Sequence, residues 1–159
     1  MQNVFDYLEK ITIPYERHEH IAVFGVDDAK EVNMGGEFGE NKNLFLRNRK
    51  GNTHYLITVP AFKEINLDAL AEKLGEKDLS FASGERLLKY LGVTRGSVSP
   101  FGLLNDIERE VIFVCDTELL ENARLGFHPN INTQTVILLT EDFKKYLESL
   151  QNEVRYMEI

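Results

Sequence analysis

The sequence predicts a single α+β domain that spans residues 1–159. Amphipathic helical segments and short β-rich runs both occur, but they do not alternate regularly, which argues against a doubly wound parallel sheet. Two runs, Val111–Cys115 and Thr135–Leu139, are apolar on both faces, as is typical of strands in a covered sheet or barrel. The length suits one domain with a substantial core, and we find no internal repeat or linker.

The first part of the chain contains helical and β-rich patterns in turn. Apolar residues at helical spacing precede Pro14, which disfavours helix in the residue before it. Two β-rich runs flank the turn-forming segment Asn48–Asn52 and predict a hairpin. In order, the expected elements are a helix over Val4–Ile11, a strand over Tyr15–His18, a helix from Asp27 or Asp28 to Gly35, and a hairpin of Leu44–Arg47 with His54–Val59.

The later helices have residues at their ends that favour capping. Asn66 can accept hydrogen bonds from the first turn of a helix that ends at Gly75. Ser83–Leu91 is predicted as a helix that is stopped by Gly92 in the same way. Thr140 is expected to cap the last helix. The apolar face of that helix comprises Phe143, Tyr146, Leu147 and Leu150.

The charge of the chain limits how it can bind nucleic acid. Its formal net charge is −8, which disfavours a broad, non-specific grip on phosphates. Basic residues nevertheless gather in two stretches, which are either solvated faces or a small nucleic-acid contact. The first comprises Lys42, Arg47, Arg49 and Lys50, and the second Arg86, Lys89 and Arg95.

The cysteine content and the apolar segments indicate the compartment. Cys115 is the single cysteine and can form no internal disulfide. The N-terminal residues lack the basic start and apolar run of a signal peptide, and no window approaches the roughly 20 apolar residues of a membrane helix. We therefore expect a cytoplasmic protein that has no membrane partner.

Three polar segments can carry chemistry, although each also has a structural explanation. Lys42 stands at the start of a β-rich run, where it can reach a phosphate or simply protect a strand edge. Gly92–Gly102 is a loop whose backbone can face a ligand, or a plain surface connection. His128 lies between apolar runs and can orient a substrate, act as a base, or hydrogen-bond at a strand end.

Several other chemistries have no support in the sequence. There is no H-E-x-x-H motif, no paired-cysteine spacing and no P-loop. His18 and His20 are two possible ligands without a third, which makes a weak metal site. Ser97 and Ser99 do not lie in a G-x-S-x-G motif. The sequence therefore predicts a site without an obvious nucleophile, metal or cofactor.

Taken in order, these segments resemble a known family. They are similar to the prolyl-tRNA editing domain superfamily, also called the YbaK-type family, and within it to the free-standing ProX (PrdX-like) deacylases. The resemblance extends from about Val4 to Leu150. Its markers are His18-Glu19-His20 with Val23-Phe24, Lys42-Asn43-Leu44-Phe45-Leu46, Leu79-Ser80-Phe81-Ala82-Ser83, Gly96 to Asp106, and Phe127-His128-Pro129 with Asn132-Thr133.

The resemblance implies a fold and an activity. The family fold is a distorted, mostly antiparallel barrel or sheet core surrounded by helices. The family activity is hydrolysis of the ester between an amino acid and the 3′ end of tRNA, without a cofactor. The implied partners are the acceptor end of an aminoacyl-tRNA and a prolyl-tRNA synthetase.

The resemblance also assigns roles to individual residues. Lys42 corresponds to the family lysine that is expected to hold the phosphate or ribose of the terminal adenosine. The loop formed by Gly96, Ser97, Val98, Ser99 and Pro100 corresponds to a G-x-x-x-P loop whose backbone positions the aminoacyl group. His128 corresponds to the pocket histidine. The further substrate-binding candidates are Asn43, Phe45, Val32 and Phe127.

The likeness to the free-standing ProX deacylases implies that the substrate is alanine attached to proline tRNA. Lost methylene groups are worth only about 1–3 kcal/mol in discrimination, so a proline site cannot strongly exclude alanine and a second pocket is needed. Cysteine attached to the same tRNA is an alternative substrate, and a non-catalytic binding module is an alternative function. The chain departs from the family pattern at Gly36–Asn41, where the family usually reads Pro-Gly-Ala-His-Thr.

Overall fold

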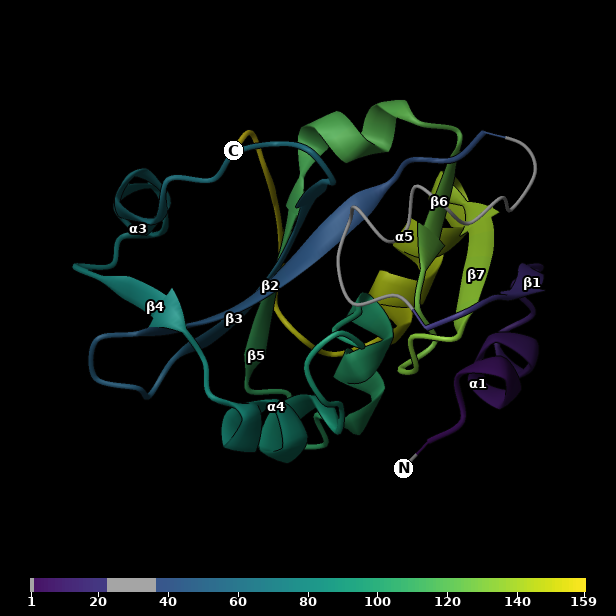
Figure 1. The fold of residues 1–159 in the computed structure, drawn as a ribbon, viewed down its shortest axis with the longest axis horizontal. Helices are drawn as coiled ribbons and strands as arrows, with labels where there is room; N and C mark the ends of the chain where they lie inside the picture. Colours follow the sequence, from purple (N-terminus) through teal and green to yellow (C-terminus); the bar gives the residue numbers. More distant parts are fainter. Residues whose placement is uncertain (1, 23–36) are drawn as a thin grey trace.

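The computed structural model describes residues 2–22 and 37–159, whose strands form two sheets (Figure 1). The smaller sheet has the strand order β1-β7-β6, and the larger has the order β4-β2-β3-β5-β8. The strands are β1 (Glu16–Glu19), β2 (Asn41–Asn48), β3 (His54–Pro60), β4 (Leu79–Phe81), β5 (Val111–Asp116), β6 (Arg124–Phe127), β7 (Gln134–Leu139) and β8 (Val154–Met157). The helices are α1 (Val4–Lys10), α3 (Leu67–Leu74), α4 (Gly84–Leu91), α5 (Thr140–Ser149) and the 3-10 helices η1 (Pro100–Asn105) and η2 (Thr117–Glu121).

Most strand pairs are antiparallel, as the family resemblance implies. The pairs β1–β7, β6–β7, β2–β3 and β2–β4 are antiparallel, whereas β3–β5 and β5–β8 are parallel. The α+β class is therefore confirmed. Within the described residues an isolated bridge between Gly39 and Leu125 links the segment before β2 to β6, but the two sheets do not close into one barrel.

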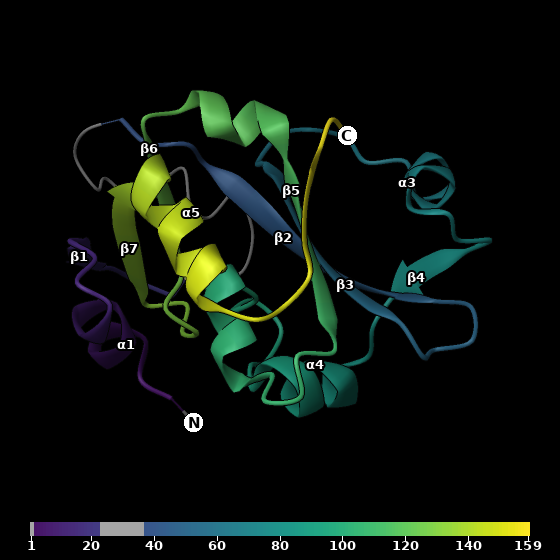
Figure 2. The same cartoon turned by 180° about the vertical axis from the view of Figure 1, so that it is seen from behind.

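The larger sheet separates two hydrophobic clusters. The larger cluster lies between the two sheets and includes Phe101, Phe113 and Phe143. The smaller cluster lies on the opposite face, beneath α3, and includes Leu46 and Leu70. Figure 2 shows α5 and α3 on opposite sides of the larger sheet.

The side chains of β2 alternate between its two faces, so this strand contributes residues to both clusters. Phe45 points into the larger cluster and Leu46 into the smaller one, because successive side chains of a strand face opposite ways.

The ends of two helices follow the capping prediction. The side chain of Asn66 accepts a hydrogen bond from the first turn of α3, and that of Ser83 does the same for α4. Both helices end at left-handed glycines, Gly75 (φ 75°) and Gly92 (φ 65°), where a side chain would be strained. The prediction for Thr140 is wrong, because its hydroxyl donates to the carbonyl of Asn122 and the cap residue Leu139 offers no side-chain bond.

The remaining elements divide into those predicted and those missed. The hairpin of β2 and β3, the strands β5 and β7, and the helices α1 and α5 lie where the sequence predicts them. The short strands β4, β6 and β8 and both 3-10 helices were not predicted. The helix expected from Asp27 or Asp28 to Gly35 falls outside the described residues. Across the part that is described, no helix has the length and apolar character to cross a membrane.

Candidate active site

A small cavity of about 70 Å³ lies where the start of β2 meets β6 and β7. Phe127 and His128 contribute to its wall from the end of β6, and Asn43 contributes from β2. These three were predicted from the sequence as site residues, and the structure brings them together around one cavity. The other lining residues are Phe38, Glu40, Asn41, Ala61, Phe62, Gly126 and Thr135.

A chain of hydrogen bonds fixes the polar side chains of this cavity. The Thr58 hydroxyl donates to Asn43 Oδ1 at 2.5 Å, and Asn43 Nδ2 donates to Asn41 Oδ1 at 3.3 Å. Asn41 Nδ2 in turn donates to the carbonyl oxygens of Gly126 and Gly39, at 2.9 and 3.1 Å. The network therefore ties β2 to β6 and holds the Asn43 amide in one orientation.

His128 presents a neutral nitrogen to the cavity. Its Nδ1 lies 2.9 Å from the carbonyl oxygen of Gln134, which can only accept, so Nδ1 carries the proton. Burial lowers the pKa of His128 below its usual value of 6.5, the bond to Gln134 opposes this change, and His20 adds to it. The imidazole is consequently neutral near pH 7, and its Nε2 is left as a hydrogen-bond acceptor.

His20 and Thr135 support this arrangement and were not predicted as site residues. His20 donates from Nδ1 to the carbonyl of Ile21 and accepts from the Thr135 hydroxyl at Nε2, at 2.7 and 2.8 Å. Its ring centre lies 6.0 Å from that of His128. The sequence signal was the pair His18 and His20, which was weighed as a weak metal site and counted as a marker of the family, but was given no role in the site. The structure gives them different partners, since His18 contacts Glu16.

Lys42 lies on the other face of β2. It pairs with Val59, which belongs to the smaller hydrophobic cluster, whereas Asn43 pairs with Thr58 on the cavity side. Lys42 is half-buried, and the described lining of the cavity does not include it. Any contact between its ammonium group and a substrate must therefore be made around the start of the strand.

Phe45 is a core residue in the structure. It is 4% exposed and packs against His54 and Tyr90, with ring centres 5.6 and 6.2 Å away. It does not line the small cavity. Val32 falls outside the described residues.

The loop Gly96–Pro100 is largely buried and lies beside the segment that follows His128. Ser99 is fully buried, and its hydroxyl accepts from the N–H of Phe101 at the start of η1. The Tyr146 hydroxyl donates to the carbonyl of Pro100 at 2.8 Å, and Asn130 Nδ2 donates to that of Phe101 at 3.2 Å. The loop is thereby held against the His128 segment, although it is not among the described lining of the small cavity.

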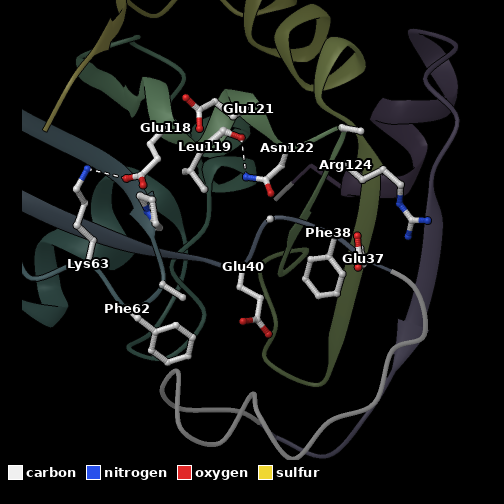
Figure 3. A pocket seen from close by; sticks show the side chains of 14 residues that line it. Glu37, Phe38, Glu40, Phe62, Lys63, Glu118, Leu119, Glu121, Asn122 and Arg124 are labelled. Atoms are coloured by element: carbon white, nitrogen blue, oxygen red, sulfur yellow. Dashed lines mark hydrogen bonds and ion pairs between the residues drawn. The ribbon is translucent and has the colours of Figure 1, made fainter.

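A second, larger cavity of about 1060 Å³ adjoins the first (Figure 3). The two share four lining residues, Phe38, Glu40, Ala61 and Phe62. Figure 3 shows Glu40 between Phe62 and Phe38, and Arg124 at the side near Glu37. The carboxylates of the larger cavity, Glu37, Glu40, Glu118 and Glu121, outnumber its two basic residues, Lys63 and Arg124.

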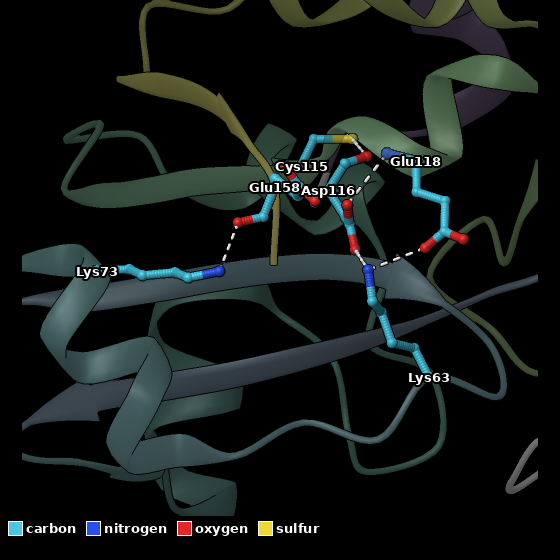
Figure 4. Close-up of polar contacts among 6 residues, drawn as sticks. All are labelled: Lys63, Lys73, Cys115, Asp116, Glu118 and Glu158. Carbon is cyan, nitrogen blue, oxygen red and sulfur yellow. Dashed lines mark hydrogen bonds and ion pairs between the residues drawn. The ribbon is translucent and has the colours of Figure 1, made fainter.

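Lys63, in the lining of the larger cavity, forms a tight ion-pair cluster with two carboxylates (Figure 4). Its Nζ lies 2.7 Å from Asp116 Oδ2 and 2.9 Å from Glu118 Oε2, and these bonds raise the pKa of Lys63. Asp116 is fully buried and also accepts from the N–H of Glu118, at the start of η2. This lysine is therefore occupied in anchoring η2 and is not free to bind an anion.

Cys115 has no part in either cavity. It is fully buried, and burial raises the pKa of its thiol to about 12. A thiol in this state is a poor nucleophile. The small cavity thus offers a fixed amide, a neutral imidazole acceptor and apolar walls, which can orient a substrate for attack by water. The protein is of the α+β class, and its small cavity is lined by both polar and apolar side chains.

Comparison with known proteins gives the family. The model of the aminoacyl-tRNA editing domain matches residues 22–146. The prolyl-tRNA editing protein ProX of Acetoanaerobium sticklandii is 39% identical over 99% of this chain and 96% of its own length. The prolyl-tRNA synthetase associated domain-containing protein 1 of Bos taurus is 34% identical over 89% of this chain and 85% of its own. The chain belongs to the aminoacyl-tRNA editing domain family, and it is an aminoacyl-tRNA hydrolase.

Solved structures agree in fold. The crystal structure of a candidate trans-editing enzyme for prolyl-tRNA synthetase has a TM-score of 0.68, covers 91% of this chain and 87% of its own, and is 19% identical. A hypothetical protein has a TM-score of 0.75, covers 99% and 98%, and is 16% identical. These similarities concern the fold alone.

Proposed function

We propose that this chain removes alanine from mischarged proline tRNA, acting in the cytoplasm as one editing domain over residues 1–159. The proposal depends mainly on the small cavity of about 70 Å³, in which Asn43 and His128 face apolar walls. The relative named ProX, which covers nearly the whole chain, supports prolyl-tRNA as the substrate class.

The neutral imidazole suits an aminoacyl ester. The α-amino group of such an ester is positively charged near neutral pH, and a charged histidine beside it would repel it. In our proposal His128 Nε2 accepts a hydrogen bond from this ammonium group, while the Asn43 amide contacts the ester. Lys42 contacts the terminal phosphate or ribose from the start of β2.

Hydrolysis then requires water and stabilisation of the oxyanion. The aminoacyl ester is already reactive, and one preorganised N–H donor is worth on the order of 3 kcal/mol in the transition state. Backbone N–H groups of the Gly96–Pro100 loop are proposed to supply this. Within the described residues, the N–H groups of Gly96 and Val98 have no hydrogen-bond acceptor. Water adds to the carbonyl carbon, and the tetrahedral intermediate releases alanine and the tRNA ribose hydroxyl.

The test is release of amino acid from Ala-tRNA(Pro), Cys-tRNA(Pro) and Pro-tRNA(Pro), measured separately. We expect rapid loss of alanine, slow loss of proline, and a reduction of about 10–100-fold in kcat/KM for Asn43→Ala. Lys42→Ala should lose activity as well, whereas Lys10→Ala, on α1, should not. Preferential loss of cysteine would reassign the substrate, and no hydrolysis of any of the three would refute the proposal.

A further inference from the structure

Two groups of basic residues that are distant in sequence lie side by side in the structure. The turn between β2 and β3 carries Arg49 and Lys50, and α4 carries Arg86 and Lys89. The Arg86 guanidinium donates to the carbonyl oxygen of Gly51 at 2.9 Å and so joins the helix to the turn. Figures 1 and 2 both show this turn and α4 far from α1.

We call this region the hairpin basic surface. It comprises Arg47, Arg49, Lys50, Arg86 and Lys89. Arg49, Lys50 and Lys89 are exposed, and Arg47 and Arg86 are half-buried. Although the chain as a whole has a net charge of −8, this surface concentrates positive charge.

Three of these cations lie near enough to His54 to lower its pKa. Burial and then Arg86, Lys89 and Arg47, in that order, lower the pKa of His54 to about 4, and Asp106 opposes them. Arg86 lies 2.8 Å from His54 Nε2, which must accept from it. The imidazole therefore stays neutral near pH 7 and helps to hold Arg86 in position.

Few carboxylates neutralise the surface. Arg49 pairs with Asp78 at 3.5 Å, but both side chains are largely exposed, and such pairs contribute little. Glu85, on α4, is exposed. Within residues 2–22 and 37–159, no ion pair engages the rest of the hairpin basic surface.

The strand β2 connects this surface to the small cavity. Arg47 and Asn43 lie on the same face of β2, since they are four residues apart. At the usual rise of a strand they are separated by about 13 Å. Phe45, between them on that face, is buried, so a nucleic-acid strand would pass around β2 and not along this face. A few single-stranded nucleotides can cover the distance. The larger cavity, in contrast, is lined by four glutamates, which would repel phosphates.

We propose that the hairpin basic surface binds phosphates of the tRNA acceptor stem while the single-stranded 3′ end spans the remaining distance to the small cavity. The proposal rests on the proposed function for the identity of its ligand. Arg and Lys neutralise phosphates irrespective of base sequence, so the contact strengthens and orients binding without selecting the tRNA.

The first test is binding of an RNA hairpin with the acceptor stem of tRNA(Pro). The variant Lys50→Glu/Lys89→Glu alters two exposed side chains that lie outside both cavities. We expect its Kd to rise by roughly 10-fold or more and the slope of log K against log salt to fall by about 2. The control Lys10→Glu/Lys145→Glu changes the net charge equally on α1 and α5 and should bind like the wild type.

The second test separates this surface from the catalytic site. The alanyl ester of the trinucleotide CCA lacks the acceptor stem, so the wild type and Lys50→Glu/Lys89→Glu should hydrolyse it at equal rates. The surface is refuted by an unchanged Kd and salt slope, by an equal loss in the control variant, or by a loss on the short ester. If the wild type hydrolyses neither Ala-tRNA(Pro) nor the short ester, the proposed function fails. The comparison of Kd values then still shows whether the hairpin basic surface binds RNA.

Discussion

At the scale of single residues, His128 illustrates how a protein fixes a protonation state. The carbonyl of Gln134 determines which ring nitrogen carries the proton, and burial determines that the other stays free of one. Both effects arise from neighbours in space. The residue type alone would allow a base, an acid or a metal ligand.

The pH dependence of deacylation should report on His128. Because its pKa is lowered, the neutral form persists as the pH falls below 6.5, and activity should decline only at lower pH. His20 contributes to the lowering, so His20→Gln should move the acid limb of the kcat/KM profile to higher pH. The measurement is kcat/KM between about pH 5 and 8. A wild-type limb above 6.5, or no movement in the variant, would contradict this assignment.

At the scale of elements, Asp106 joins three parts of the chain. This buried carboxylate follows η1 and accepts from the N–H of Val111 at 2.8 Å, at the start of β5. It also accepts from the N–H of Glu110 at 3.3 Å and from Asn152 Nδ2 at 2.8 Å. The three bonds set where η1 meets the larger sheet.

Removal of this carboxylate should therefore destabilise the fold. Asp106→Ala leaves buried donors unsatisfied, and we expect the free energy of unfolding to fall by about 3 kcal/mol. Urea unfolding monitored by circular dichroism would measure it. Glu108→Ala, two residues away and exposed, should change the free energy of unfolding by less than about 0.5 kcal/mol. A loss in Asp106→Ala no larger than that of the control would show that η1 is held by packing alone.

Local and non-local elements differ in how far the sequence predicts them. Helix α3 begins at Asn66 and ends at Gly75 for reasons contained within a few residues, so the prediction is confirmed. Thr140 resembles a cap equally well, but its hydroxyl is taken by Asn122 from another part of the chain. The strands β6 and β8 are short, and only their partners make them strands.

In the candidate site, too, the sequence predicts some residues and misses features that depend on contacts distant in sequence. Asn43, Phe127 and His128 were identified from sequence and share a cavity. The sequence does not say which face of a strand carries Lys42 and which carries Asn43, because that depends on the register with β3. Thr135 was missed since its role comes from contact with His20.

At the scale of the whole molecule, the larger sheet has the small cavity on one face and the smaller hydrophobic cluster on the other. The smaller hydrophobic cluster lies on the face away from the small cavity, whereas the larger cluster includes Phe127, which lines it. Phe143 packs on Phe127, with ring centres 4.6 Å apart. A substitution in the smaller cluster should therefore lower stability alone, whereas one in the larger cluster should also slow deacylation.

We expect Leu70→Ala to lower the free energy of unfolding by about 2–4 kcal/mol and to leave kcat of the folded enzyme unchanged. Phe143→Leu, in the larger cluster, should lower both quantities because it displaces Phe127. The comparison requires unfolding curves and single-turnover deacylation at a temperature where both variants are folded. If Leu70→Ala slowed deacylation as much as Phe143→Leu, the two clusters would not be independent.

The pairing of β1 has a consequence for how the chain folds during synthesis. Glu16 lies opposite Ile137, and Glu19 lies opposite Gln134, so the partner that β1 has among residues 2–22 and 37–159 is made only after most of the sequence has left the ribosome. In the larger sheet, β5 pairs with β3 on one edge, but its other edge stays unpaired until β8 is made. Contacts between residues so distant in sequence slow folding. The nascent chain therefore carries unpaired strand edges for much of its translation, and such edges favour aggregation.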